Sequence, residues 1–73
     1  MRITIKLFAA FRKGRFDAEV REVSPGTTVS DVVDLLRLPG SIGILFVNSR
    51  HADLSQELAD GDTLSIFPLV GGG

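Results

Sequence analysis

Side chains of the types that carry out catalysis are scarce in this chain. The 73 residues include no cysteine, and the one histidine is His51. These absences exclude disulfide scaffolds, zinc fingers, thiol nucleophiles and dyads built on histidine. His51 follows Arg50 in a predicted turn, where a histidine is more often an ordinary surface residue than a catalyst. The sequence therefore predicts no catalytic residue and no metal site.

Two groups of charged residues could bind a ligand. Asp60 and Asp62 flank a turn glycine, and a metal would need more ligands than this loop offers, so we expect both carboxylates to accept hydrogen bonds from turn amides. The other group is the basic segment Arg12-Lys13-Gly14-Arg15. It could meet an acidic surface or a phosphate, or it could be a solvated loop.

The strongest candidate for chemistry is the end of the sequence, Gly71-Gly72-Gly73. Glycine has no side chain to bury and loses the most backbone entropy on ordering, so we expect a flexible glycine tail over 71–73 after a folded domain over 1–70. A segment without Cβ atoms can thread a channel too narrow for other residues. Its terminal carboxylate would then reach a buried active site in a partner enzyme. The alternative is a frayed end without function.

Composition and charge are those of one small folded domain. Apolar residues make up 44% of the chain, and eight Lys and Arg against nine Asp and Glu leave a net charge of −1. These values exclude a disordered chain and a generally basic nucleic-acid binder. The apolar stretches are only a few residues long, and the start of the chain does not resemble a signal peptide. We expect a cytoplasmic protein that binds neither membrane nor nucleic acid.

Alternating apolar and polar residues predict two strands, at 2–7 and 16–21. The apolar positions are Ile3, Ile5 and Leu7 in the first strand and Phe16, Ala18 and Val20 in the second. The connector at 9–15 is too long for a tight turn but suits an antiparallel pair. Proline and glycine at 25–26 end the second strand.

Thr28 and Asp31 predict the start of a helix, because they have the spacing of a capping box and Asp31 suits the positive end of the helix dipole. The apolar stripe behind them contains Val29, Val32, Val33 and Leu36. Pro39-Gly40 should end the helix after about three turns.

The rest of the chain predicts two more strands. Residues 42–47 are apolar throughout, which is typical of a strand covered on both faces or lying under the helix. After a turn at 48–50, we expect Leu54 and Leu58 to anchor a polar stretch to the core. A turn at 60–62 leads to a last strand at 63–67, which Pro68 ends.

This order of elements predicts an α+β fold. A helix that follows a hairpin must cross over the sheet, which places the last strand parallel to the first strand in the middle of the sheet. That arrangement is the β-grasp, or ubiquitin-like, fold. We expect a mixed sheet of four to five strands with one main helix packed on one face.

The parallel pairing also predicts an aromatic patch on the uncovered face of the sheet. Phe8 and Phe67 should lie there among Thr4, Lys6, Thr63, Ser65 and Leu69. Two aromatic rings and a leucine on a polar face favour a docking surface for a partner protein, to which we add Val70. The alternative is that the 9–15 connector or the tail folds over one of the rings.

Three segments resemble the MoaD/ThiS family of ubiquitin-like sulfur carriers, and the resemblance covers essentially the whole chain. The segments are Ile5–Arg12, Phe46–Asn48 and Leu58–Pro68, the last with the letters LADGDTLSIFP. After them the family usually has a second proline and two glycines, where this chain has Leu69 and three glycines. The Phe-Pro-x-Val form is most similar to the small subunit of molybdopterin synthase.

The resemblance implies a carrier that has no catalytic residue of its own. An ATP-dependent activating enzyme would adenylate the carboxylate of Gly73, and a sulfur donor would displace AMP to leave a thiocarboxylate. The activating enzyme would use the ATP, and the carrier itself would hold no cofactor stably. The sulfur would pass to the large catalytic subunit of molybdopterin synthase.

Three alternatives remain open from the sequence. The same carrier chemistry could serve thiazole synthase in thiamine synthesis. The activated Gly73 could instead be attached to lysines of target proteins, as in a ubiquitin-like protein modifier. The chain could also be a non-catalytic β-grasp interaction module whose glycines have no function.

Overall fold

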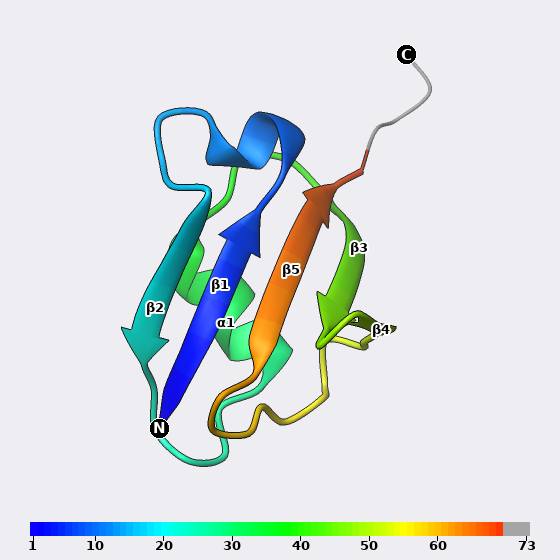
Figure 1. Ribbon diagram of the computed structural model, residues 1–73. Coiled ribbons are helices and arrows are strands. Elements are labelled where there is room, and N and C mark those ends of the chain that lie inside the picture. Colours follow the sequence, from blue (N-terminus) through cyan, green and yellow to red (C-terminus); the bar gives the residue numbers. More distant parts are fainter. Residues whose placement is uncertain (70–73) are drawn as a thin grey trace.

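Strands β1 (Arg2–Leu7) and β5 (Thr63–Pro68) lie side by side and parallel in the centre of the sheet in the computed structural model, which describes residues 1–69 (Figure 1). The strand order is β2-β1-β5-β3-β4, and the other neighbouring pairs are antiparallel. The remaining elements are the 3-10 helix η1 (Ala9–Arg12), β2 (Ala18–Glu22), α1 (Val29–Leu36), β3 (Ile42–Val47) and β4 (Arg50–His51). This architecture confirms the predicted α+β, β-grasp fold.

The core lies between the sheet and α1, which packs on one face of the sheet (Figure 1). Alternate side chains of the two central strands enter it and are fully buried; they are Ile3, Ile5, Leu7, Leu64 and Ile66. The helix contributes Val29 and Val32, and η1 contributes Phe11, which is 1% exposed. Burial of each such side chain stabilises the fold by about 1.5–3 kcal/mol relative to leaving it in water. The predicted connector therefore also supplies a core residue.

Helix α1 begins as predicted and ends early. Thr28 Oγ1 accepts a hydrogen bond from the Asp31 amide at 3.2 Å, and Asp31 Oδ2 accepts one from the Thr28 amide at 2.9 Å. The helix ends at Leu36, because Arg37 takes the left-handed conformation (φ 49°, ψ 53°) before Pro39 is reached. The helix has eight residues rather than about three turns. Within residues 1–69, no helix is long and apolar enough to cross a membrane.

Replacing Thr28 with Ala is expected to lower the free energy of unfolding by about 1 kcal/mol, because the hydroxyl that accepts from the Asp31 amide is lost. Urea unfolding followed by far-ultraviolet circular dichroism measures this difference. Thr28→Ser keeps the hydroxyl and serves as the control. Equal stability of Thr28→Ala and Thr28→Ser would contradict the assigned role of the cap.

Strand β2 is shorter than predicted, and its apolar residues face away from the helix. The strand begins at Ala18, so Phe16 precedes it. Glu19 and Arg21 pair with the buried Ile5 and Ile3 and therefore lie on the helix side, where they form an ion pair. They are tolerated there because β2 is an edge strand and both side chains stay more than one third exposed. Val20 lies on the other face and is 60% exposed.

Strand β3 is covered on one face only, so of the two predicted possibilities the strand lies under the helix and is not covered on both faces. Leu45 and Val47 are buried, whereas Ile44 is 47% exposed and Phe46 is half-buried. The reason is that the helix packs on one side of the sheet. The apolar side chains on the other face of β3 therefore lie at the molecular surface and not in the core.

The stretch between β4 and β5 is held partly by its backbone. Leu58 is buried as predicted, but Leu54 is 47% exposed and does not anchor the loop. The Leu54 carbonyl instead accepts from the Ser30 amide at 2.8 Å, and the Gln56 carbonyl accepts from the Val29 amide at 2.9 Å. These bonds satisfy first-turn amides of α1 that have no partner within the helix.

The turn predicted at 48–50 is a two-residue hairpin that creates a fifth strand. Asn48 (φ 52°) and Ser49 (φ 67°) have the positive φ at both central positions that a type I′ turn requires. The chain reverses there, and Arg50 and His51 pair with Val47 and Phe46. His51 is therefore on a strand, not in the turn.

Candidate functional site

The face of the sheet opposite α1, here called the open face, carries the aromatic pair expected from the sequence. In the parallel register, Lys6 lies beside Ser65. Two residues further along the chain, the Phe8 amide donates to the Ile66 carbonyl at 3.2 Å, which brings Phe8 next to Phe67. The rings of Phe8 and Phe67 stack with centroids 4.1 Å apart and planes 11° from parallel. Both side chains are half-buried.

Two more rings extend this pair across β3 and β4. The Phe46 ring meets the Phe67 ring edge-on, with centroids 5.8 Å apart, and it meets the His51 ring edge-on at 4.9 Å. Phe8, Phe67, Phe46 and His51 form what we call the aromatic cluster. A shallow hollow of about 250 Å³ beside it is lined by Phe46, Ser49, Ser65 and Phe67.

Sequence reasoning missed Phe46 and His51 as members of this surface. The apolar run at 42–47 concealed the alternation of buried Leu45 and Val47 with half-buried Phe46. The signal that could have found them is the two-residue turn at Asn48 and Ser49, because a tight hairpin places residue 51 directly opposite residue 46.

The one aromatic side chain of the connector at 9–15 enters the core and not the open face. This residue, Phe11, is buried in the core together with Leu7 and Ile66. The Phe8 and Phe67 rings stack on each other, and the Phe67 ring also contacts the Phe46 ring. The predicted alternative of cover by the tail lies outside the described residues.

Strand β5 leads directly from the aromatic cluster to the last described residue. Leu69 is 61% exposed, and its amide donates to the Ser41 carbonyl at 2.9 Å. Three of the predicted docking residues, Phe8, Phe67 and Leu69, therefore lie at the same end of the two central strands. The fourth, Val70, and the predicted tail Gly71, Gly72 and Gly73 lie outside the described residues.

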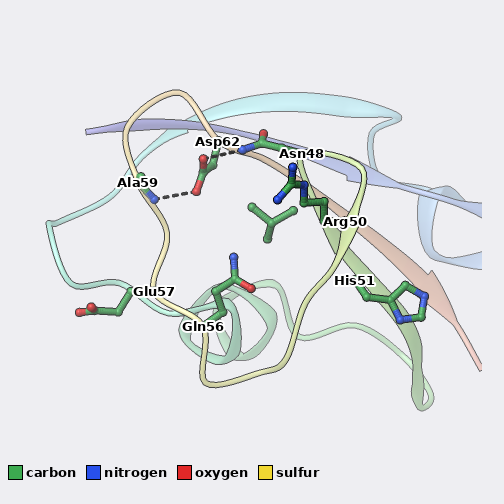
Figure 2. A pocket seen from close by; sticks show the side chains of 8 residues that line it. Asn48, Arg50, His51, Gln56, Glu57, Ala59 and Asp62 are labelled. Atoms are coloured by element: carbon green, nitrogen blue, oxygen red, sulfur yellow. Dashed lines mark hydrogen bonds between the residues drawn. The ribbon is translucent and has the colours of Figure 1, made fainter.

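Asp60 and Asp62 accept backbone hydrogen bonds, but only Asp62 bonds to a turn amide as predicted, because the partner of Asp60 is an amide of strand β1. Asp62 accepts from the Ala59 amide at 2.7 Å and from the Asn48 side-chain amide at 2.8 Å, as Figure 2 shows. Asp60 accepts from the Arg2 amide at 2.7 Å. The two bonds to Asp62 join residues that line an open polar pocket of about 700 Å³ between the β3–β4 turn and the 56–62 loop. Within residues 1–69, no group of three or more His, Cys, Asp and Glu residues could hold a metal ion.

The basic segment at 12–15 is exposed. Arg15 donates to the carbonyl of Arg37 at 3.3 Å, which ties the connector to the end of α1. The ion pairs in the described part of the chain join Arg2 to Glu22 and Arg21 to Glu19, and neither involves this segment. The contacts are compatible with a solvated loop and with contact to an acidic partner.

Comparisons with known proteins agree with this geometry. The chain matches the model of the ThiS family over residues 5–73. No curated protein matches it in sequence. It is similar to the solved structure of a putative molybdopterin converting factor, subunit 1, from Pyrococcus furiosus, with 29% identity and a TM-score of 0.80 over 96% of this chain and 99% of that one.

Two further solved structures are similar over the whole length of both chains. SAMP1 from Haloferax volcanii, a small archaeal modifier protein, is 27% identical with a TM-score of 0.77. A complex of subunits 1 and 2 of molybdopterin-converting factor from Helicobacter pylori contains a chain that is 20% identical with a TM-score of 0.68. The similarity to the Helicobacter chain supports the fold alone.

Proposed function

Since the chain belongs to the ThiS family, we propose that it is a sulfur carrier that bears the sulfur on its C-terminal carboxylate and donates it to molybdopterin synthesis. The observation that carries this proposal is the aromatic cluster at the end of β5, in a family member whose sequence continues into three glycines. In this proposal an enzyme binds the cluster, and the glycines, which have no side chains, carry the reactive carboxylate into its active site.

The chemistry needs no catalytic side chain from this protein. A carboxylate oxygen of Gly73 attacks the α-phosphorus of ATP in the activating enzyme, and pyrophosphate leaves. Sulfide-level sulfur from a donor then attacks the acyl carbon and expels AMP, which leaves a thiocarboxylate. The sulfur of a thiocarboxylate is a better nucleophile than a carboxylate oxygen. The activating enzyme consumes the ATP, and we place the reaction in the cytoplasm.

The aromatic cluster is the docking surface in this proposal. Half-buried aromatic rings that lie together on a sheet face are the type of group that contributes most to protein binding. Phe67 lies on the strand that leads to the tail, and four residues beyond Leu69 span at most about 14 Å when fully extended. An enzyme that binds the cluster therefore needs its active site within that distance of Leu69.

The similarity to molybdopterin converting factor subunit 1 at 29% identity supports the molybdopterin pathway, as does the Phe-Pro-x-Val sequence at the end of β5. In that pathway, the partner is the large catalytic subunit of molybdopterin synthase. Membership of the ThiS family supports the alternative, delivery to thiazole synthase. Co-purification from the native host tests the choice: the molybdopterin synthase large subunit is expected, and thiazole synthase would overturn the assignment of the pathway.

Protein modification is a second candidate function, and the similarity to a small archaeal modifier protein favours it. Activation at Gly73 is the same. The acyl carbon is then attacked by a lysine amine of a target protein instead of by sulfur, AMP leaves, and an isopeptide bond forms. The two functions therefore differ in the nucleophile and share the adenylate.

Reconstitution tests the proposed function. The purified chain is mixed with the activating enzyme of its host, ATP and sodium sulfide, and its intact mass is measured. We expect an ATP-dependent product in which one oxygen is replaced by sulfur. Omission of ATP is the control. An unchanged mass would contradict the proposal, provided that the same enzyme preparation adenylates another carrier protein.

A further inference from the structure

Gly43 is a glycine whose presence the backbone conformation does not explain. The other glycines within residues 1–69 lie in turns with positive φ: Gly14 (70°), Gly26 (90°), Gly40 (86°) and Gly61 (86°). Gly43 lies within strand β3, outside that region of φ. A glycine inside a strand weakens it and often marks a close approach of another backbone.

The space around Gly43 is filled by the backbone that leads into the tail. A Cβ atom at this position would lie 2.6 Å from the Pro68 carbonyl oxygen and 2.8 Å from both the Pro68 carbonyl carbon and the Leu69 nitrogen. Real Cβ atoms essentially never approach heavy atoms within 3.0 Å. All three clashing atoms belong to the backbone of the Pro68–Leu69 peptide, so the clash cannot be relieved by rotation of a side chain.

An irregularity in β3 brings Gly43 to this place. Ile42 pairs with Pro68 and Ile44 pairs with Phe67, so Gly43 is an extra residue opposite the end of β5. On the same edge, the Leu69 amide donates to the Ser41 carbonyl at 2.9 Å. The Pro68–Leu69 peptide is thus held by the Ser41 carbonyl and by the close contact with Gly43. Its position sets where the chain leaves the sheet.

We infer that Gly43 is a positioning residue for the tail. This inference rests on the proposed function, in which the carboxylate of Gly73 must reach a buried active site. Relieving a 2.6 Å contact to an ordinary 3.4 Å contact requires a shift of about 0.8 Å. A tail that is fully extended in a narrow channel cannot compensate for a shift of the residues that precede it, so the reacting carboxylate shifts too. A misplacement of a reacting group by about 1 Å can reduce a rate by about a hundredfold.

The test uses Gly43→Ala in ATP–pyrophosphate exchange with the activating enzyme, at varied concentrations of the carrier. We expect kcat to fall at least about tenfold and KM to stay within about twofold, because the substitution alters no residue of the aromatic cluster. Ile3→Val, which removes one buried methyl group at the far end of β1, is the control for lost stability. Unchanged kcat in folded Gly43→Ala would overturn the inference, as would an equal loss of kcat in Ile3→Val.

A measurement that does not depend on activity separates this inference from the proposed function. Hydrogen exchange of the Leu69 amide, followed by nuclear magnetic resonance, should be at least about tenfold faster in Gly43→Ala, while the β1 amides keep their protection. Unchanged exchange at Leu69 would overturn the inference. If the wild-type chain is never adenylated, the proposed function fails. The exchange result still decides whether Gly43 determines the position of the Pro68–Leu69 peptide.

If Gly43→Ala does not fold, Leu69→Pro moves the same peptide from its other side. Proline cannot donate to the Ser41 carbonyl, and its ring would press against that oxygen. Leu69→Ala keeps the amide and is the matched control for the lost side chain. A kcat at least about tenfold lower in Leu69→Pro than in Leu69→Ala is expected, and equal values would overturn the inference.

Discussion

Appending one phenylalanine after Gly73 is expected to abolish adenylation and sulfur transfer, with a loss of at least about a hundredfold in rate. The proposed function requires the terminal glycines to pass through a channel that admits no side chain. A single ring at the end blocks that passage and also moves the carboxylate by one residue. ATP–pyrophosphate exchange and intact mass after incubation with sulfide measure the two steps.

Appending one glycine after Gly73 is the matched control. It moves the carboxylate by the same distance along the chain but adds no side chain. We expect the glycine variant to retain more activity than the phenylalanine variant, and both to keep the melting temperature of the wild type. Undiminished sulfur transfer by the phenylalanine variant would contradict the requirement for a thin tail.

Phe67→Asp is expected to weaken binding of the activating enzyme by about thirtyfold to a thousandfold, which corresponds to about 2–4 kcal/mol. The substitution removes the ring that stacks on Phe8 and meets Phe46, and it places a charge in the centre of the aromatic cluster. The fold should survive, because Phe67 lies on the open face and is not in the buried core. Isothermal titration calorimetry measures the affinity, and circular dichroism checks the fold.

Val20→Asp is the control for Phe67→Asp. It places the same charge on the same open face, at a site that is 60% exposed on the edge strand β2 and outside the aromatic cluster. Its affinity for the activating enzyme should stay within about twofold of the wild type. A similar loss of affinity in both variants, or a molten Phe67→Asp variant, would show that the cluster is not the docking surface.

The positions of the main elements could be predicted because local patterns determine them. The Thr28–Asp31 capping box marks the start of α1, and both of its hydrogen bonds are present. The end of the helix could not be predicted, because Arg37 takes a left-handed conformation that its residue type does not favour.

The open face was only partly predictable. Alternation and parallel pairing were enough to place Phe8 and Phe67 on the same face, and the structure adds that their rings stack. In β3, all the residues except Gly43 are large and apolar, so the sequence does not show which of them face the helix and which face outward. Gly43 within this apolar run could indicate a close approach of another backbone, but the sequence does not show which one, because Pro68 is 25 positions away and approaches only in the folded sheet.

The measurement that tests the central claim most directly is the intact mass of the protein isolated from its native host, with the activating enzyme present. The sulfur-carrier account predicts that part of the protein carries one sulfur in place of an oxygen, at the terminal glycine in fragment spectra. A ladder of larger adducts linked through Gly73 would favour protein modification instead. A chain that carries neither the sulfur nor an adduct would contradict the claim that Gly73 is the reactive group.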